Sequence, residues 1–451
     1  MEWEKILDRL NGFVETNKLS ELRGALMIMN VVDIAEFLSS LESDKMLKVF
    51  RILPKDISSD VFSYMDDEQR QSLMEKIGDK EIGELVSDMF VDDAVDFLEE
   101  LPAGLVKRVL ANVDEEQRKV INRFLRYPDY SAGSIMTIEF CDFHVGTTVL
   151  DAMKELKRTG VDKETIYTLY VIDEKRKLLG TVPLRRLILA NDDAPIESLM
   201  NANFVCAETM DDQEHVVELV RKYDLNSIPV VDKEGRLVGI ITSDDVMDVL
   251  EEEATEDIEK MNALLPSEEE YIKTGVFKLA KNRLPWLMFM MVSGIFTGLI
   301  IVYFENILTN IESIGVALTA CIPMLMGTGG NCGSQASTLA IRGLAVGELE
   351  PKDVLKVLWK EFRVAAIVSV ALAGINMLIQ LFVFKRAMLV AFTVSIAMIF
   401  TVLLSKSIGC TLPMLAKKLK LDPALMAAPL ITTIVDACSL LILFAFAAII
   451  I

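Results

Sequence analysis

Asp436 occupies a position that demands a chemical explanation. It is the only charged residue after Ala424, and its polar neighbours are Thr432, Thr433 and Ser439 in an otherwise apolar stretch. At about 1.5 Å per residue, a helix of this length crosses a bilayer core of roughly 30 Å. A carboxylate inside such a helix costs about 2.5–3.5 kcal/mol on insertion scales. Two interpretations follow: a buried carboxylate bonded to another helix, or a cation site on a translocation path.

A second unusual segment interrupts another apolar run. GTGGNCGSQAS, residues 327–337, lies within the apolar residues 314–341 and is too polar and flexible to face lipid. Non-helical backbone at membrane depth must line a cavity or be buried in protein, so we expect this segment to present carbonyl oxygens. With the Asn331 amide and Asp436 these oxygens form a ligand set that suits Mg²⁺ or Ca²⁺ rather than zinc or copper.

Residues 276–451 are predicted to form an all-α transmembrane domain that positions these groups. Lys406 is expected near one end of the fourth span, where its ammonium can reach the interface. Lysine and arginine gather in the loops 342–363 and 414–421, so the positive-inside rule places residues 1–274 in the cytoplasm and the C-terminus outside. The five predicted spans are 284–304, 314–341, 364–384, 387–405 and 422–451.

Charge divides the 451 residues into two parts. Residues 275–451 hold 14 Lys+Arg and 8 Asp+Glu, net +6, whereas residues 1–274 hold 32 and 59, net −27. So acidic a region attracts cations and disfavours nucleic acid. The scattered cysteines and two histidines indicate neither a disulfide framework nor a zinc site. Without a catalytic Ser/His or Cys/His set or a P-loop, we expect no enzyme, and the acidic N-terminus predicts no signal peptide.

Residues 1–128 are predicted to form an acidic helical-repeat N domain. LPKDISSDVFSYMDDEQRQSL (53–73) matches LPAGLVKRVLANVDEEQRKVI (101–121) at a shift of 48. Repeated helical hairpins of this kind stack into a superhelix. On its own, the pattern indicates a solvated acidic face.

Residues 129–252 form a second repeat, built from β-rich segments. TLYVIDEKRKLLGTVPLRRLI (168–188) aligns with SIPVVDKEGRLVGIITSDDVM (227–247) at a shift of 59. Each unit is predicted as a strand, a helix, a strand, a turn, a strand and a helix. This order resembles a tandem pair of α/β CBS domains, a regulatory module that often binds adenine nucleotides.

The second CBS-like repeat carries a turn that fits a nucleotide. In such modules a G-h-h-T-x-x-D turn can hold a ribose through its Thr and Asp, and Gly239, Thr242 and Asp245 match this pattern. The first repeat has Pro183 and Arg186 at the equivalent places. The resemblance implies at most one site for ATP or another adenine nucleotide, with an empty structural module as the alternative.

A charged segment joins the two parts of the chain. Between Asp244 and Glu259 there is a run of carboxylates and no basic residue, with Val246 and Val249 among the apolar residues at helical spacing. Residues 253–275 are predicted as a linking helix. Like charges at this spacing repel one another, so the helix is well placed to transmit a change.

The order of these parts resembles the MgtE family of magnesium channels. The resemblance covers essentially the whole chain and is carried by PMLMGTGGNCGSQAS (323–337) and DPALMAAPLITTIVD (422–436). It implies a homodimer in a lipid membrane whose pore lies on the two-fold axis, with Asp436 as the central pore aspartate. Ala428 stands where some relatives have Asn, which leaves the preference among divalent ions open.

The family resemblance also implies a Mg²⁺ sensor where the N domain, the CBS pair and the linking (plug) helix meet. At ~6 Å and an effective dielectric constant near 20, two carboxylates repel by roughly 3 kcal/mol, so a dication between them favours a compact state. The candidate ligands are all acidic: Asp60, Asp92, Asp96, Asp212, Glu214, Asp224, Asp244, Asp245, Asp248, Glu253, Glu256 and Asp257.

Three functions compete at this point. The first is a Mg²⁺-selective channel that mediates magnesium uptake and is closed by cytoplasmic Mg²⁺. The second is a secondary transporter of divalent cations such as Mg²⁺ and Co²⁺. The third is a membrane-tethered nucleotide or metal sensor that transports nothing, but such a protein has no use for Asp436 inside a span.

Overall fold

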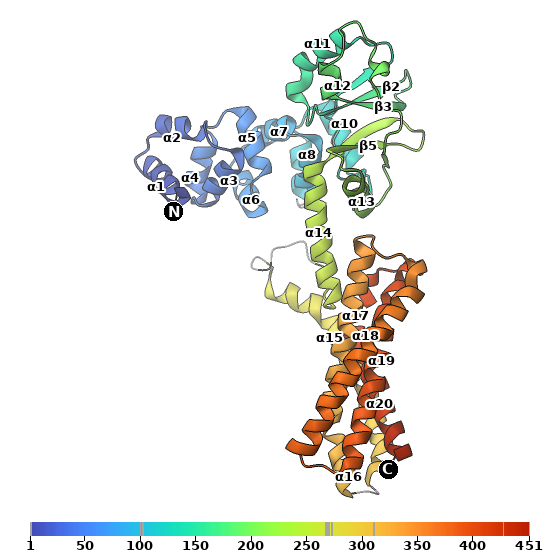
Figure 1. Ribbon diagram of the computed structural model, residues 1–451. Coiled ribbons are helices and arrows are strands. Elements are labelled where there is room, and N and C mark those ends of the chain that lie inside the picture. Colours follow the sequence, from blue (N-terminus) through green and yellow to red (C-terminus); the bar gives the residue numbers. More distant parts are fainter. Residues whose placement is uncertain are drawn as a thin grey trace. The chain divides into compact units, whose positions relative to one another are not determined.

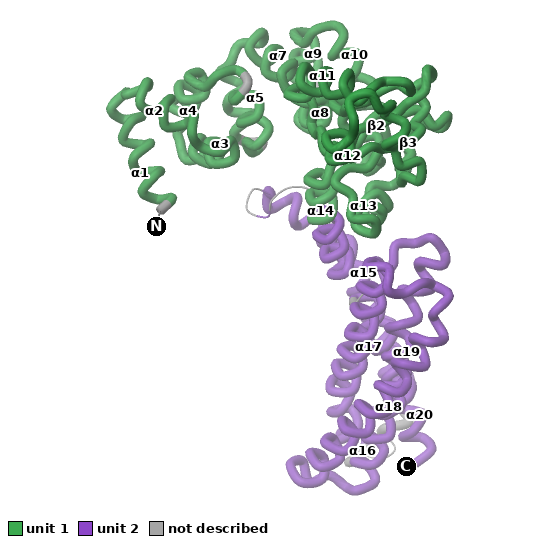
Figure 2. The backbone as a smooth tube through the Cα atoms, turned by 45° about the horizontal axis from the view of Figure 1, so that its top comes forward, with its two compact units in different colours: residues 1–251 green, residues 252–451 purple. Residues whose placement is uncertain are grey.

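The computed structural model describes residues 2–99, 101, 103–266, 271, 274–309, 312–426 and 428–450. The chain divides into two compact units, Met1–Glu251 and Glu252–Ile451 (Figure 2). Short helices and small sheets build the first unit, and long helices build the second (Figure 1). The predicted multidomain architecture is therefore confirmed.

The N domain is a stack of short amphipathic helices. Alternate helices contact one another, α3 with α5, α5 with α7 and α7 with α9, as expected for stacked hairpins. Asp66 and Asp114 occupy the same place in the 48-residue repeat, and each caps the next helix by accepting backbone N–H groups. The helices are α1 (Glu2–Glu15), α2 (Leu19–Leu26), α3 (Val31–Ser39), α4 (Ser43–Phe50), α5 (Lys55–Ser63), α6 (Asp67–Met74), α7 (Asp79–Asp88), α8 (Val91–Glu99), α9 (Ala103–Leu110) and α10 (Glu115–Phe124).

The two CBS repeats fold in the predicted order of elements. In each sheet the first two strands pair in parallel and the last two antiparallel. Asp173 and Asp232, which align at the 59-residue shift, each accept two backbone N–H groups in the turn that follows. The elements are β1 (Asp142–His144), α11 (Val149–Thr159), β2 (Thr168–Ile172), β3 (Leu178–Pro183), α12 (Leu184–Ile188), β4 (Ala207–Glu208), α13 (Gln213–Tyr223), β5 (Ser227–Val231) and β6 (Leu237–Thr242), with 3₁₀ turns η1 (Gly160–Asp162) and η2 (Ile196–Ser198).

The last helix of the second CBS repeat is also the linking helix. This helix, α14 (Ser243–Met261), starts and ends earlier than the predicted 253–275. It ends because Ala263 adopts a left-handed φ of +56° and the Leu264 N–H bonds back to the Glu259 carbonyl at 2.9 Å. Within the predicted range, residues 267–270 and 272–273 lie outside the described residues.

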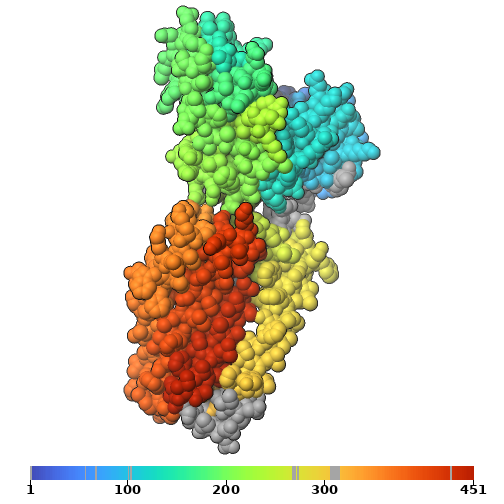
Figure 3. Space-filling model, turned by 90° about the vertical axis from the view of Figure 1, so that its right-hand side faces the viewer, coloured from blue at the N-terminus to red at the C-terminus, as the bar shows by residue number. Residues whose placement is uncertain are grey.

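The second unit is a bundle of long apolar helices. Helices α17, α19 and α20 pack against one another, and α18 packs on α19. Helix α15, yellow in Figure 3, lies along α20 and leaves its outer apolar face uncovered. The elements are α15 (Val276–Thr309), α16 (Glu312–Thr319), α17 (Ile322–Ala345), the 3₁₀ turn η3 (Pro351–Asp353), α18 (Val354–Leu378), the π-helical turn η4 (Ile379–Val383), α19 (Met388–Lys418), the 3₁₀ turn η5 (Pro423–Met426) and α20 (Ala428–Ile450).

Among the described residues, four helical segments are long and apolar enough to cross a membrane: Val276–Phe304, Pro351–Val383, Met388–Lys418 and Pro423–Ile450. The remaining predicted span, 314–341, falls on α16 and α17. Helix α17 has 24 residues, but its Gly, Ser, Thr and Asn residues lower its hydropathy. The count of five spans stays a prediction.

The expectation of non-helical backbone at 327–337 is wrong, because α17 runs as one α-helix through this segment. Its glycines permit close packing instead. A Cβ on Gly409 of α19 would lie 2.2 Å from the carbonyl oxygen of Gly333. Small residues let membrane helices approach closely, and here that packing outweighs the poor helix propensity of glycine.

Lys406 does not reach an interface as expected. It lies inside α19 with 5% of its surface exposed, and its Nζ is 3.3 Å from Glu361 Oε2 on α18. A buried ammonium is tolerated when a carboxylate compensates its charge, and Glu361 supplies that charge here.

The contact between α17 and α19 generates a prediction. Gly409→Ala is expected to lower the thermal unfolding midpoint of the purified full-length protein, because backbone atoms of Gly333 cannot move aside. Overpacking of this kind costs about 1–3 kcal/mol. Gly374→Ala in α18 is the matched control, since its Cβ meets nothing within 4 Å. Equal midpoints for the two variants would contradict the close contact.

Candidate functional site

The Gly-rich face of α17 packs against α20 around Asp436. A Cβ on Gly329 would lie 2.9 Å from Val435 Cγ1, and one on Gly330 would lie 3.1 Å from Thr432 Cγ2. On α20 the first contact lies one residue before Asp436 and the second lies one turn before it. Asn331 follows Gly330 on α17, and its side chain is exposed within this unit. The structure therefore brings the two predicted pore residues to the same level of the bundle.

Asp436 is half-buried and has no hydrogen-bond or ion-pair partner among the described residues. The nearby hydroxyls are used elsewhere, since Thr432 and Thr433 both donate to the Pro429 carbonyl at 3.0 Å and Ser439 donates to the Val435 carbonyl at 2.6 Å. This geometry does not support a carboxylate bonded to another helix. In the described structure, the oxygens of Asp436 therefore remain available to a cation.

The ligand set predicted for this site loses its backbone members. Because α17 is helical, the carbonyls of 327–337 are positioned for hydrogen bonds within the helix. Side-chain oxygens of Asp436 and Asn331 remain. Hard oxygen donors of this kind suit Mg²⁺ that keeps part of its water shell.

A second group of carboxylates gathers in the first unit. Asp92 and Asp93 come from α8, Asp244 and Asp245 from the first turn of α14, and Glu164 from the connection after α11. Burial together with the charges of these neighbours raises the pKa of Asp245 to about 6 and that of Glu164 to about 7. The cluster of these five residues, called the acidic cluster below, draws its members from the N domain and both CBS repeats.

Asp92 is the most confined member of the acidic cluster. Burial and then the charge of Asp245 raise the pKa of Asp92 well above its ordinary value. Its Oδ1 atom is buried and has no hydrogen-bond partner among the described residues. Burial also raises the pKa of Asp93, although Ser63 donates a hydrogen bond to it. An orphaned carboxylate oxygen beside other carboxylates fits a divalent cation.

The acidic cluster contains three of the predicted sensor residues, Asp92, Asp244 and Asp245, and the charge of Asp60 also acts on Asp93. Sequence reasoning missed Glu164 and left Asp93 out of the sensor set. The adjacent Asp92–Asp93 pair was a usable signal, whereas nothing near Glu164 in the sequence marks it. The other predicted residues of this unit are exposed: Asp96, Asp212, Glu214, Asp224 and Asp248.

The side chains of this cluster are near one another without forming a closed ligand shell. Within the described ranges, no group of three or more His, Cys, Asp or Glu side chains is placed to hold a metal ion. No lysine or arginine forms an ion pair with Asp92, Glu164, Asp244 or Asp245 in that part of the chain. Their charge is therefore not compensated by protein cations.

The remaining predicted sensor residues, Glu253, Glu256 and Asp257, lie half-buried on the part of α14 that belongs to the second unit. Burial and the charge of Asp422 raise the pKa of Asp257. Lys260 Nζ lies 2.6 Å from Glu256 Oε1 and 2.8 Å from Asp422 Oδ2. Burial lowers the pKa of Lys260, but the bonds from Asp422 and Glu256 outweigh this effect and raise it.

The predicted nucleotide turn is held by its own side chains. Thr242 donates from its backbone N–H at 3.1 Å and from its hydroxyl at 2.6 Å to Asp245 Oδ2. Gly239 is packed so closely that a Cβ would lie 2.6 Å from Met136 Sδ. In the first repeat, Arg186 donates to the Leu199 carbonyl at 3.2 Å. Asp245 thus belongs both to this turn and to the acidic cluster.

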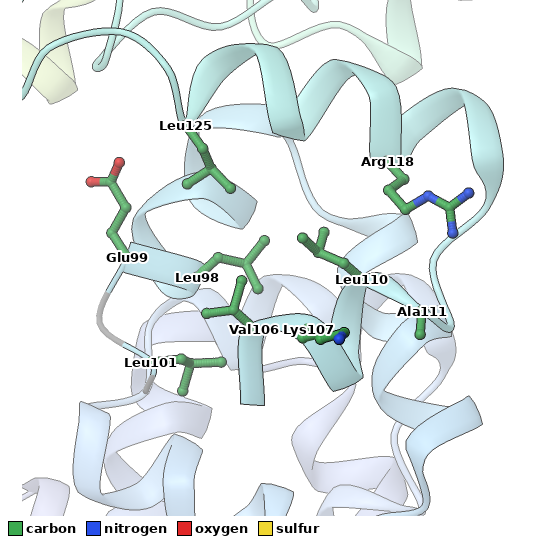
Figure 4. A pocket seen from close by; sticks show the side chains of 9 residues that line it. All are labelled: Leu98, Glu99, Leu101, Val106, Lys107, Leu110, Ala111, Arg118 and Leu125. Carbon is green, nitrogen blue, oxygen red and sulfur yellow. The ribbon is translucent and has the colours of Figure 1, made fainter. Parts of the chain in front are cut away.

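An apolar pocket of about 600 Å³ lies on the N domain between α8, α9 and α10, with leucine side chains pointing into it (Figure 4). None of the predicted ligand residues lines it. Its lining residues are Leu98, Glu99, Leu101, Val106, Lys107, Leu110, Ala111, Arg118 and Leu125.

Three family profiles match consecutive parts of the chain. A CBS-domain profile matches twice, and the helical repeats before it match the profile of the MgtE intracellular N domain. The profile described as a divalent cation transporter, MgtE, covers most of the bundle that holds Asn331 and Asp436. The matched residues are 29–130 for the N domain, 132–193 and 196–252 for CBS, and 322–446 for the transporter profile.

Whole-chain relatives agree with these profiles. The chain is 33% identical over 443 residues to the magnesium transporter MgtE of Thermus thermophilus, covering 97% of each protein. It is 31% identical over 447 residues to MgtE of Bacillus subtilis, covering 99% of this chain and 98% of the relative.

Two solved structures resemble the first unit. The crystal structure of the soluble part of a magnesium transporter is 30% identical, with a TM-score of 0.54, and covers 56% of this chain and 99% of its own. The cytosolic domain of the Mg²⁺ channel MgtE in complex with ATP is 33% identical, with a TM-score of 0.51, and covers 54% and 99%. From its domain order, its membrane helices and these similarities, the chain belongs to the MgtE family of magnesium transporters.

Proposed function

We propose that this protein is a Mg²⁺-selective channel for magnesium uptake that closes when Mg²⁺ binds on the cytoplasmic side. The observation that carries the proposal is Asp436, a carboxylate in a membrane helix without a partner among the described residues. Such a group costs free energy in a membrane unless a cation uses it. The magnesium transport named for full-length relatives supports the identity of the ion.

The pore is proposed to lie on the axis of a homodimer. Two copies of Asp436 would then present two negative charges to one dication, with Asn331 as a further oxygen donor. Mg²⁺ releases its water reluctantly, so these oxygens would hold the hydrated ion. Conduction requires that this binding be loose enough to release the ion.

The acidic cluster is proposed as the Mg²⁺ sensor. Asp92, Glu164, Asp244 and Asp245 have no lysine or arginine partner in the described structure, so they favour either protons or a dication. A Mg²⁺ ion between α8 and the first turn of α14 would favour a compact arrangement of the N domain and CBS pair. Because α14 continues into the second unit, this preference would bias the pore towards closure.

Nucleotide binding by the CBS pair is a further part of the proposal. The ATP complex of a related cytosolic domain and the double CBS match support it. The assignment to Gly239, Thr242 and Asp245 stays a prediction, because Thr242 and Asp245 already bond to each other.

Flux into liposomes tests the proposed pore. Asp436→Ala is expected to abolish Mg²⁺ uptake by purified protein, and Asp436→Asn to reduce it less severely, because the amide keeps an oxygen without the charge. Glu348→Gln, which changes a carboxylate outside the membrane helices, is the matched control. Uptake at the wild-type rate by Asp436→Ala would refute the proposed role. An uptake rate that depends on a second ion gradient would favour a secondary transporter, and no uptake by wild-type protein would favour the non-transporting sensor.

The sensor is tested in the same liposomes with Mg²⁺ varied on the cytoplasmic face. Wild-type uptake is expected to stop at millimolar Mg²⁺, whereas the combined variant Asp92→Asn, Glu164→Gln and Asp245→Asn is expected to stay open. Glu174→Gln with Asp192→Asn removes two exposed carboxylates of the same domain and serves as the control. Monovalent salt at equal ionic strength checks for screening. Normal closure of the triple variant argues against the acidic cluster.

Protons should replace Mg²⁺ in the acidic cluster. A carboxyl group whose pKa is raised in the compact state stabilises that state when it is protonated. This contribution is fully present below the ordinary pKa near 4, and it is lost as pH rises through 6 to 7. The rise for Asp245, from 3.8 to about 6, corresponds to about 3 kcal/mol at most.

Amide hydrogen exchange in α8, corrected for its intrinsic pH dependence, is therefore expected to accelerate between about pH 5.5 and 8 without Mg²⁺. Millimolar Mg²⁺ should flatten this profile, and so should the Asp245→Asn and Glu164→Gln substitutions. A profile that is independent of pH in Mg²⁺-free wild-type protein would contradict the assignment.

A further inference from the structure

One contact between α14 and the start of the pore helix already contains a cation. Lys260 lies one turn after Glu256 on α14, and its ammonium bridges Glu256 Oε1 at 2.6 Å and Asp422 Oδ2 at 2.8 Å. All three side chains are largely buried, with exposed fractions of 23%, 35% and 30%. Asp257 also faces this site, because the charges of Asp422 and Lys260 both act on it.

Asp422 uses its two oxygens for different tasks. Oδ2 binds Lys260, whereas Oδ1 accepts the backbone N–H of Ala424 at 2.8 Å. That second bond holds the first turn of η5, which leads directly into α20 and Asp436. Asp422 therefore links Lys260 on α14 to the turn that precedes α20.

The acidic cluster of the first unit offers a contrast. There, Asp92 Oδ1 is buried without a partner and no lysine or arginine of the described chain pairs with Asp244, Asp245 or Glu164. At the junction of α14 with η5, the carboxylates of Glu256 and Asp422 already share an ammonium. The acidic cluster requires a mobile cation to become compact, whereas the junction of α14 with η5 does not.

We infer that Lys260 is a tethered cation that keeps the junction of α14 with η5 closed independently of Mg²⁺, so that Glu256 and Asp422 are not Mg²⁺ ligands in this protein. One consequence of this inference rests on the proposed gating: Mg²⁺ sensing is confined to the acidic cluster. Lys260 is a positioning residue that couples α14 to the pore helix. An ammonium held on the same helix as Glu256 is always present at the site, whereas Mg²⁺ must first lose part of its hydration shell.

The test is amide hydrogen exchange of the full-length protein in lipid nanodiscs at micromolar and millimolar Mg²⁺. In wild-type protein, exchange at residues 256–261 and at Ala424 is expected to be the same at both concentrations, while exchange in α8 slows with Mg²⁺. In Lys260→Met, exchange at the junction is expected to be about fivefold to tenfold faster at micromolar Mg²⁺. Millimolar Mg²⁺ should restore it, because the freed carboxylates then accept the dication.

Two variants separate charge from packing. Lys260→Arg keeps the cation and should behave as wild type, and Lys281→Met, an exposed lysine of α15, is the matched control. Junction exchange in wild-type protein that slows with Mg²⁺ as much as α8 overturns the inference, and so does a Lys260→Met junction unchanged at micromolar Mg²⁺. Both results come from hydrogen exchange and need no measurement of ion flux. A failure of the proposed channel function can therefore be told apart from a failure of this inference.

Discussion

Carboxylate charge without a matching protein cation is the interaction on which the rest of this structure depends. It occurs inside the membrane bundle at Asp436 and in the first unit at Asp92 and its neighbours. In both places burial raises the free energy of the bare anion, and no lysine or arginine of the described structure pairs with Asp436 or Asp92. A site of this kind is suited to a mobile cation, which would supply the missing partner. In the function that we propose, carboxylate oxygens would serve both the passage of Mg²⁺ and its sensing.

The membrane site depends on glycines of α17, whose lack of a side chain lets neighbouring helices approach closely. Gly329, Gly330 and Gly333 bring α17 against α20 and α19 where larger residues would hold the helices apart. The hydroxyls of Thr432, Thr433 and Ser439 are bonded to carbonyls of their own helix. Within the described part of the chain, the carboxylate of Asp436 therefore has no hydrogen-bond partner, and the close approach of the two backbones shapes its surroundings more than polar neighbours do.

Sequence reasoning succeeded where the signal was local or repeated. Asp436 stands out because charge is rare in an apolar helix, and the shifts of 48 and 59 residues predicted the helical hairpins and the CBS order. It failed where tertiary packing decides. Residues 327–337 are helical despite their glycines, since neighbouring helices supply the stabilisation that propensity lacks.

Other features required distances that no pattern encodes. Glu164 joins the acidic cluster only through the fold, because its sequence neighbours include no other member. Lys406 is buried because Glu361, on another helix, meets it. The early end of α14 depends on one left-handed residue, Ala263, of a type that seldom adopts that conformation. Five membrane spans and the residue-level ligand sets therefore remain predictions.

The two CBS repeats carry opposite charges at one equivalent position. Arg186 and Asp245 align at the 59-residue shift, yet Arg186 bonds to a nearby carbonyl whereas Asp245 caps the turn before α14 and faces other carboxylates. A duplicated fold offers the same turn twice, and here the two turns differ in charge at this position and in Pro183 against Thr242. Such a duplication lets the two copies diverge: one copy can keep the architecture alone, while the other would also carry the ion chemistry that we propose for Asp245.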